Sequence, residues 1–316
     1  MALQCAFKSP LTYATRQSSW KDRLTISQLC TVGYFMARST LRWHLRQSIR
    51  HTALALCGPI FLQRFFSKET GADYHIGFWR KVQLIYRMYR NRFKVVTTSG
   101  LLGQIVMVTE LLRVPRSLTG VVVECGSYEG GSTVNLSLAC GLVGRTLHVF
   151  DSFEGLPQPA EADTNRFIPS TGDVYSFRKG GFNGSLETVR SNVRRFGNID
   201  VCKFHVGWLE DTLPRFSERC VFAFCDVDLK NSYETCLMYL WPTLADSCCL
   251  FTHEANHMEI AGLFFDKVWW SKNLHCDPPG LVGGGSGLGL YDSGLGYFRS
   301  SIGFALKNGA REESHR

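Results

Sequence analysis

VVVECGSYEGGST, residues 121–133, joins a short apolar run to a glycine-rich turn and to the beginning of a helix. Glu124 lies near the end of the run, and Gly126, Gly130 and Gly131 follow it. Glycines let the backbone turn sharply and approach a ligand, and free amides at a helix start favour an anionic group. The spacing differs from the GxGxxG of dinucleotide-binding folds. We interpret it as a turn for S-adenosylmethionine, with Glu124 receiving the ligand's ammonium; a purely structural turn is the alternative.

Apolar runs and helical segments alternate on both sides of this turn. Strands are expected over residues 121–125, 146–150, 201–206, 220–225 and 248–252, and helices over 132–143, 183–196, 232–241 and 259–270. Strands separated by helices form parallel βαβ units. The pattern therefore predicts an α/β fold with an open, mostly parallel Rossmann-like sheet and helices on both faces. Ligands of such sheets bind at the carboxyl ends of the strands.

The N-terminal part predicts a helical extension. Apolar residues recur at helical spacing from Ile76 to Phe93, with basic residues between them, and a second helix is expected from Leu101 to Arg113. The basic helix either packs on the core with a solvated face or is attracted to an acidic surface, such as a membrane or a partner. We expect a basic extension of unknown role over residues 1–70 and a methyltransferase-type domain over 71–310, with its core at 121–270.

Charge and composition narrow the classes of partner. Residues 1–100 hold 16 Lys and Arg against 3 acidic residues, whereas the other 216 residues hold 19 against 24. This distribution argues against a nucleic-acid groove in the core.

No apolar run approaches the roughly 18 residues of a membrane span, so we expect a cytoplasmic protein; the basic residues at the beginning leave organelle targeting open. The 12 cysteines form no CxxC pair, which favours buried thiols in a reducing compartment over a zinc site.

Acidic side chains follow the expected strands. Asp151 ends the second strand, where a carboxylate can accept the two hydroxyls of a ribose; a turn-forming or capping Asp is the alternative. Asp226 and Asp228 follow the fourth strand, and His253 and Glu254 follow the fifth. Both acids after the fourth strand reach the cleft only if the strand has already ended.

Two acids at a cleft indicate a metal ligand and a general base. The fourth and fifth strands are commonly neighbours in this architecture. We therefore expect Asp226, His253 and Glu254 to converge on one divalent cation.

The chain resembles the macrocin O-methyltransferase family, also called the TylF-type family. The matching text is VVECG with GGS at 130–132, DSFEGLP at 151–157, VGW at 206–208 before DTLP, and DVDL at 226–229 before Ser232 and Tyr233. The resemblance covers residues 121 to about 270. It implies a class I fold that binds S-adenosylmethionine, methylates hydroxyl groups, often on sugars of natural products, and uses a divalent cation, usually magnesium.

The resemblance also implies roles for individual residues. It places Glu124, Gly126 and Ser132 near the methionine end of the cofactor, Asp151 and Ser152 at the ribose, and Gly207 and Trp208 beside the adenine. It makes Asp226 a metal ligand and Asp228 the general base.

One departure from the family concerns the cation. The family's next two ligands are usually adjacent acids, whereas this chain has His253 and Glu254. The cation could therefore be magnesium or a transition metal. Two alternatives without a cation also stay open: a metal-free enzyme with His253 as base, and a cofactor-binding module without catalysis. Residues 158–182 are expected to be a substrate lid over a small hydroxylated acceptor. The sequence leaves the oligomeric state open, a homo-oligomer included.

Overall fold

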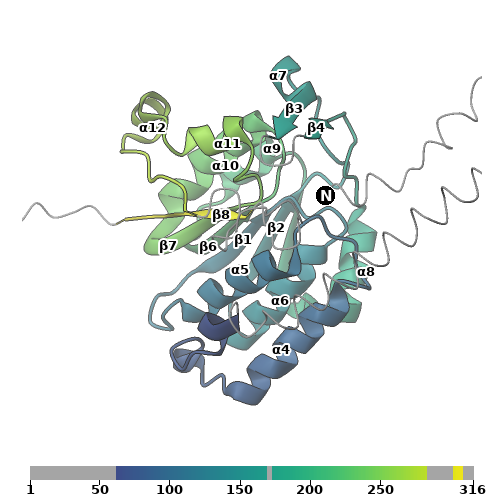
Figure 1. Ribbon diagram of the computed structural model, residues 1–316, viewed down its shortest axis with the longest axis vertical. Coiled ribbons are helices and arrows are strands. Elements are labelled where there is room, and N and C mark those ends of the chain that lie inside the picture. Colours follow the sequence, from purple (N-terminus) through teal and green to yellow (C-terminus); the bar gives the residue numbers. More distant parts are fainter. Residues whose placement is uncertain (1–61, 169–172, 283–301, 309–316) are drawn as a thin grey trace, which may run out of the picture. The chain divides into compact units, whose positions relative to one another are not determined.

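The computed structural model describes residues 62–168, 173–282 and 302–308, and its centre is a six-stranded sheet (Figure 1). The strands lie in the order β5-β2-β1-β6-β7-β8. All neighbours are parallel except β8, which runs antiparallel to β7. Their bounds are β1 Val121–Cys125, β2 Leu147–Asp151, β5 Cys202–Val206, β6 Cys220–Cys225, β7 Leu244–Thr252 and β8 Gly303–Leu306. The expected open, mostly parallel sheet is confirmed.

Helices cover both faces of the sheet, as the alternation of apolar runs predicts (Figure 1). The helices α4 (Phe78–Asn91), α5 (Leu101–Arg113), α6 (Gly131–Val143) and α8 (Leu186–Phe196) lie on one side, and α10 (Lys230–Thr243), α11 (Met258–Leu263) and α12 (Lys267–Leu274) lie on the other. Successive strand residues point to opposite faces. Val122 and Phe222 thus join the core on the α5 and α6 side, while Val123 and Ala223 join the core on the α10 side.

The path of the chain creates a crevice beside β1. From β1 the chain continues through β2 to β5 on one side, and then crosses to β6, β7 and β8 on the other. The connections that follow β1 and β6 therefore leave the sheet in opposite directions. Ligands of open α/β sheets bind at such a reversal.

Several elements differ from the sequence expectation. The helix expected over 259–270 is two helices, because the Asp266 side chain accepts a hydrogen bond from the Trp269 amide and begins α12 there. Ser185, not Asn183, caps α8, accepting from the Thr188 amide. The expected lid contains a short helix, α7 (Glu161–Thr164), and a hairpin of β3 (Asn165–Ile168) and β4 (Asp173–Ser176).

Short turns and segments complete the described chain. The helix α9 spans Leu209–Thr212, and 3-10 turns span Ala72–Tyr74, Ile199–Val201 and Leu213–Arg215. Phe65, which precedes the expected domain boundary near residue 70, is fully buried in the core beside α4 and α5. The boundary itself stays a prediction. No helix among the described residues is both long and apolar enough to cross a bilayer. The glycine-rich segment at 280–296 lies mostly outside the described residues.

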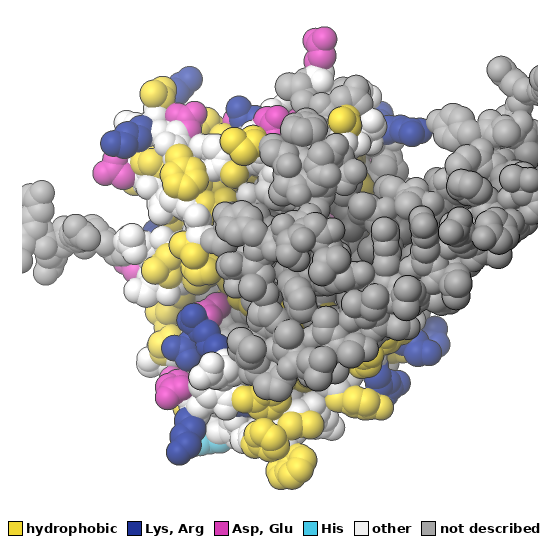
Figure 2. All heavy atoms as spheres, in the orientation of Figure 1, with side chains coloured by type: hydrophobic (Ala, Val, Ile, Leu, Met, Phe, Trp, Pro, Cys, Tyr) yellow, Lys and Arg dark blue, Asp and Glu magenta, His cyan; other side chains and the backbone are white. Residues whose placement is uncertain are grey.

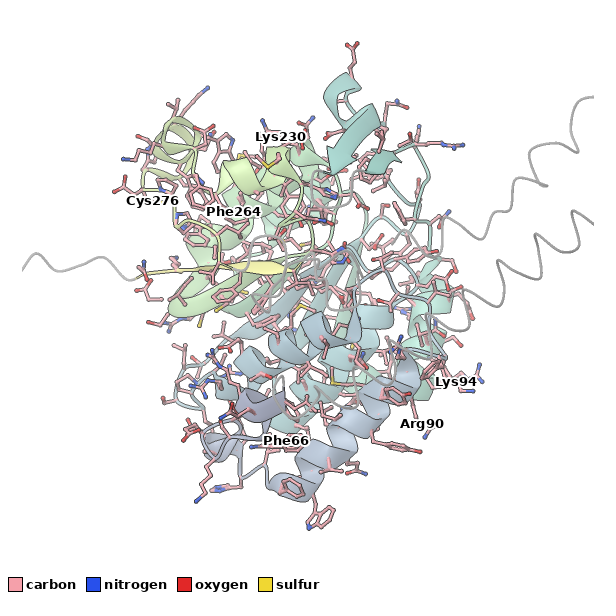
Figure 3. The ribbon with its side chains drawn as sticks, viewed as in Figure 1. Phe66, Arg90, Lys94, Lys230, Phe264 and Cys276 are labelled. Carbon is pink, nitrogen blue, oxygen red and sulfur yellow. The ribbon has the colours of Figure 1, made fainter. Side chains whose placement is uncertain are left out.

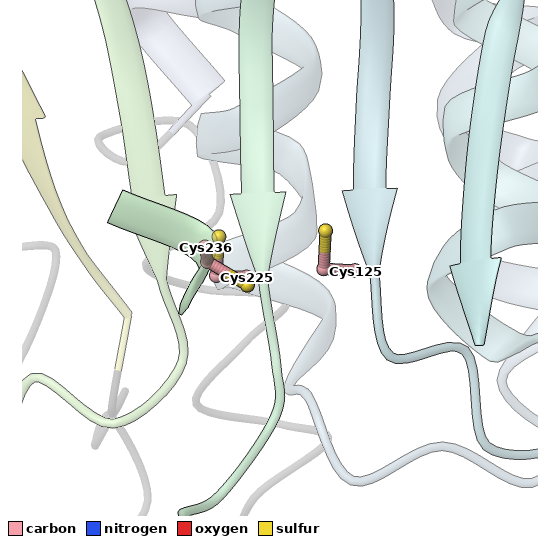
Figure 4. A group of neighbouring side chains, drawn as sticks. All are labelled: Cys125, Cys225 and Cys236. Atoms are coloured by element: carbon pink, nitrogen blue, oxygen red, sulfur yellow. The ribbon is translucent and has the colours of Figure 1, made fainter. Parts of the chain in front are cut away.

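Three thiols meet in the core on the α10 side (Figure 4). Cys125 on β1, Cys225 on β6 and Cys236 on α10 are buried, and their sulfur atoms lie within 4.8 Å of one another. No cysteine motif in the sequence predicts this cluster, because the three residues come from separate elements. Burial raises the pKa of the Cys125 and Cys236 thiols well above the ordinary value, so both pack as neutral, small apolar groups.

Candidate cofactor and cation site

A pocket opens at the carboxyl ends of four parallel strands, with about 670 Å³ of empty space that includes open solvent. Its lining comes from the turns after β1, β2, β5 and β6: Gly126, Tyr128, Phe150, Asp151, Ser152, Gly155, Leu156, Pro157, Trp208, Leu209, Glu210, Asp226, Val227, Asp228 and Ser232, joined by Thr98 and Phe182. Six of the sequence-predicted residues line this pocket: Gly126, Asp151, Ser152, Trp208, Asp226 and Asp228.

The turn after β1 is fixed by a close approach of two backbones. Gly126 has φ +83°, and a Cβ there would lie 2.0 Å from the carbonyl oxygen of Asp226. The Asp226 amide donates to the Cys125 carbonyl at 2.9 Å, which holds the two strand ends together. Glycine is therefore required by contact between the β1 and β6 connections, in addition to any approach of a ligand.

Glu124 is a fully buried acid that points to the start of α6. Neither of its carboxylate oxygens accepts a hydrogen bond from the described residues. Burial raises the pKa of Glu124 to about 8, and the neighbouring Ser132 and Thr133 lower it only in part. The amides of the first turn of α6 have no partner within the helix. A buried, unpartnered carboxyl group beside free amides suits the ammonium and carboxylate of an amino-acid moiety.

Asp151 holds the neighbouring turns in place. Its Oδ2 accepts from the amide and the hydroxyl of Ser127 at 2.6 and 2.8 Å, and its Oδ1 accepts from the Phe153 amide at 2.7 Å. A carboxylate offers about four acceptor sites, so these three bonds leave one for a ligand. Asp151 therefore holds these turns, as the structural alternative has it, and its ribose role stays a prediction that has one acceptor site left to it.

Aromatic side chains form the side of the pocket next to β5. Trp208 lines the pocket directly after Gly207, whose amide donates to the Asp151 carbonyl at 3.0 Å. Phe150 also lines the pocket and stacks on His205, with ring centroids 4.1 Å apart. Flat apolar groups beside the Asp151 carboxylate suit a purine ring.

Asp226, His253 and Glu254 converge behind the opposite side of the pocket. Each can offer one ligand atom, and these atoms lie within 4.8 Å of one another. His253 Nδ1 lies 3.0 Å from Asp226 Oδ1 and 3.5 Å from Glu254 Oε1. Glu254 Oε1 is buried and accepts no hydrogen bond from the described chain. Two carboxylates and one imidazole with converging ligand atoms fit a divalent cation.

The charges of this cluster are strongly interdependent in the protein alone. Burial lowers the pKa of His253, but Asp226 and Glu254 outweigh burial and raise that pKa to about 10. Burial raises the pKa of Asp226, in the opposite direction. The charge and hydrogen bond of His253 lower this pKa by more, so that it lies below the ordinary value. Asp226 and His253 thus form an ion pair, and a cation that binds there must displace the imidazole proton.

The hydroxyl of Tyr233 contacts the carboxylate of Glu254 in this cluster. Its hydroxyl contacts Glu254 Oε2, lies 2.7 Å from the Cys225 carbonyl and accepts from the Thr252 hydroxyl at 2.7 Å. The tyrosine is fully buried on α10. It connects the last residue of β6 to the cluster and fixes the direction of the Glu254 carboxylate.

Asp228 lies at the pocket in a strained backbone conformation. β6 ends at Cys225, so Asp226 and Asp228 both follow the strand and both line the pocket. Asp228 is buried and has φ +58°, and the Leu229 amide donates across it to the Val227 carbonyl at 2.6 Å. Non-glycine residues in this region store strain, which is common at functional sites.

The expected residues fall into two groups around the pocket. Gly126, Asp151, Ser152, Trp208, Asp226 and Asp228 line it, whereas Glu124, Ser132, Gly207, His253 and Glu254 lie in the shell behind it. Thr98, Tyr128 and Phe182 were missed by sequence reasoning. Tyr128 and Phe182 pack edge to face, and both have positive φ. Their residue types carry no signal of that geometry.

Residues 107–257 match the family described as Macrocin-O-methyltransferase (TylF). No curated protein matches the chain significantly. Among solved structures, the O-methyltransferase NovP has a TM-score of 0.52 at 16% identity, covering 72% of this chain and 98% of NovP, which shows the fold. The calicheamicin methyltransferase CalS11 gives 0.44 at 17% identity, over 72% and 92%. Residues 107–257 are thus similar to the macrocin-O-methyltransferase (TylF) family, and this similarity supports a methyltransferase.

Proposed function

We propose that the chain transfers the methyl group of S-adenosylmethionine to a hydroxyl group of a small acceptor, a sugar or another natural product, assisted by a divalent cation. The observation that carries the proposal is the meeting of two sets of residues at one pocket. A buried, unpartnered Glu124 and the α6 amides suit the donor's amino-acid end. Asp226, His253 and Glu254 present converging ligand atoms next to Asp228.

The donor's orientation follows from the order of the strands. Glu124, Gly126 and Ser132 would hold its methionine end, Asp151 and Ser152 its ribose, and Gly207 and Trp208 its adenine. These groups lie in sequence from β1 to β5 along the sheet edge. The methyl group would then face the residues after β6, where Asp228 lies.

The reaction forms a bond between the acceptor oxygen and the methyl carbon. The carbon–sulfur bond breaks, its electron pair stays on sulfur, and the donor becomes S-adenosylhomocysteine. A cation at the cluster would lower the pKa of the acceptor hydroxyl and orient it. Asp228 takes the hydroxyl proton as general base, and Asp226, His253 and Glu254 hold the cation.

The ligand set favours a transition metal over magnesium. Magnesium prefers oxygen ligands, and imidazole binds iron, cobalt, nickel or zinc more readily than magnesium. His253 also replaces a carboxylate of the related family and removes one negative charge. We expect weak magnesium binding that His253→Asp strengthens.

A metal-independent transferase is the second candidate. The observation that favours it is the 3.0 Å contact between His253 Nδ1 and Asp226 Oδ1, because this ion pair occupies the centre of the cluster. In that reaction His253 would have to give up the proton of the ion pair before it could act as the base, and Asp226 would orient its ring.

Chelation and restoration of single cations separate the two candidates. S-adenosylhomocysteine release is measured with a panel of sugar and phenolic acceptors, for wild type, Asp226→Ala, Asp228→Asn and His253→Asp. We expect chelation to stop release and a transition metal to restore it better than magnesium. Asp226→Ala abolishes both metal binding and activity, while Asp228→Asn keeps metal binding and slows transfer by roughly 10²–10⁴-fold.

Two outcomes would redirect this proposal. Full activity of the chelated wild type would eliminate the cation mechanism and support His253 as base. Donor binding without release on any acceptor would instead support a cofactor-binding module without catalysis.

A further inference from the structure

Helix α4 presents an outer face that the fold does not require. Leu84 and Met88 are buried and anchor the helix on α5 and α6. The opposite face carries exposed aromatic side chains: Trp79 is 78% exposed, Tyr86 59% and Phe93, just after the helix, 57%. Side chains at these spacings lie on one side of a helix. Packing of the domain explains the buried face and leaves the aromatic face unexplained.

The same face is strongly basic. Residues 74–109 hold six Lys and Arg and no acidic residue, and all of the six except the buried Lys81 are at least partly exposed. Arg80, Arg90 and Lys94 are exposed, and Arg90 lies over the Tyr86 ring at 5.8 Å. Figure 3 shows Arg90 and Lys94 pointing away from the domain, and Figure 2 shows hydrophobic and basic side chains together along the lower edge where α4 lies.

The basic surface continues onto α8. Arg87 of α4 lies 3.5 Å from the Phe196 carbonyl and 3.4 Å from the Gly197 carbonyl, at the end of α8. Arg194 and Arg195 are exposed in the last turn of α8. Exposed cations thus continue from α4 to the end of α8 that Arg87 contacts, although residues 101–316 as a whole carry more acidic than basic residues. We call this surface, formed by α4 and the last turn of α8, the α4 face.

We infer that the α4 face docks on an anionic phospholipid membrane. Aromatic side chains among arginines and lysines on one helix face are typical of helices that lie in a bilayer interface. Each Lys or Arg near an anionic leaflet adds attraction, while aromatic rings enter the headgroup region. A second copy of the chain would bring like charges together. Single-stranded nucleic acid binds aromatic rings within a basic groove, whereas here the rings stand on the convex surface of a helix.

Flotation of the full-length protein with vesicles tests the inference. The vesicles are phosphatidylcholine with and without phosphatidylserine. We expect binding only with phosphatidylserine, and weaker binding at high salt. The triple variant Arg80→Glu, Arg90→Glu, Lys94→Glu should lose about fivefold in partitioning for each cation removed. The double variant Trp79→Ser with Tyr86→Ser should also lose binding. If the basic residues 1–60 bound the vesicles by charge alone, this double variant would bind as wild type does.

A matched control comes from α12, which lies on the opposite side of the sheet. Val268 is 78% exposed, and Lys267 and Lys272 flank it. Val268→Ser with Lys267→Glu and Lys272→Glu should bind vesicles as wild type does. All variants should retain wild-type S-adenosylhomocysteine binding, since the α4 face contains none of the pocket residues.

Three results would overturn the inference. Unchanged flotation of both α4 variants would show that other residues carry any membrane binding. Preferential binding of single-stranded RNA through the same aromatic residues would identify a nucleic-acid surface. A dimer in light scattering that Trp79→Ser with Tyr86→Ser dissociates would identify the face as a contact between copies.

Discussion

Glu124, which we propose as a donor-binding residue, opposes the stability of its own fold at neutral and higher pH. Its pKa of about 8 in the folded protein lies above the ordinary value of 4.5, so the folded state binds more protons than the unfolded state between these values. Stability that Glu124 contributes at low pH is therefore lost as the pH rises through this window. A bound ligand ammonium would instead favour the ionised Glu124 carboxylate over the protonated carboxyl group.

The first prediction concerns Glu124→Gln. We expect the free variant to unfold at a higher temperature than wild type at pH 8 and to bind S-adenosylhomocysteine about 10- to 1,000-fold more weakly. Wild-type affinity should fall as the pH drops below about 8, because Glu124 becomes protonated. The ligand's own amine titrates in the same range, so the informative quantity is the difference between wild-type and variant pH profiles by calorimetry. Identical profiles would remove Glu124 from the donor site.

The second prediction concerns Tyr233→Phe. The variant removes the hydroxyl that contacts Glu254 and the Cys225 carbonyl but keeps the ring in the core. We expect manganese binding, measured by electron paramagnetic resonance, to weaken by about 10- to 100-fold, as for other groups that orient metal ligands. Tyr239→Phe is the control, since Tyr239 lies on the same helix and is exposed. Equal manganese affinity in the two variants would show that Tyr233 has only a packing role.

At the scale of elements, the sequence located the strand ends well. Glu124, Asp151 and Asp226 follow or end apolar runs, and the parallel topology brings such positions to one edge, so the site could be outlined in advance. The β3–β4 hairpin and β8 could not, because neither segment alternates clearly enough to distinguish a strand from a loop. The cysteine cluster was also invisible, since its three members meet only through packing.

The third prediction concerns the contact between the β1 and β6 connections. Gly126→Ala places a Cβ against the Asp226 carbonyl and also strains a positive φ. We expect a loss of about 2–5 kcal/mol in the free energy of unfolding. Gly144→Ala is the control, because Gly144 has φ +65° but nothing within 4 Å of the added Cβ. If denaturant unfolding shows equal losses in both variants, the backbone conformation alone, and not the contact, requires glycine at 126.

At the scale of the molecule, the pocket residues that the structure describes all lie from Thr98 onward. The fourth prediction is that deletion of residues 1–60 leaves S-adenosylhomocysteine affinity within a few-fold of wild type, since the pocket is formed by residues from Thr98 onward. Calorimetry on the soluble truncated protein measures this. A soluble, folded truncation that no longer binds the ligand would show that the N-terminal residues belong to the binding domain.

The central claim is that the pocket beside β1 takes S-adenosylmethionine. Titration calorimetry of the full-length protein with S-adenosylmethionine, S-adenosylhomocysteine and NAD tests it most directly, with folding verified by circular dichroism. We expect both S-adenosyl ligands to bind at one site per chain and NAD not to bind, because the turn after β1 lacks the dinucleotide spacing and offers Glu124 to an ammonium. A folded sample that gives no heat with either S-adenosyl ligand, or that binds NAD instead, would contradict it.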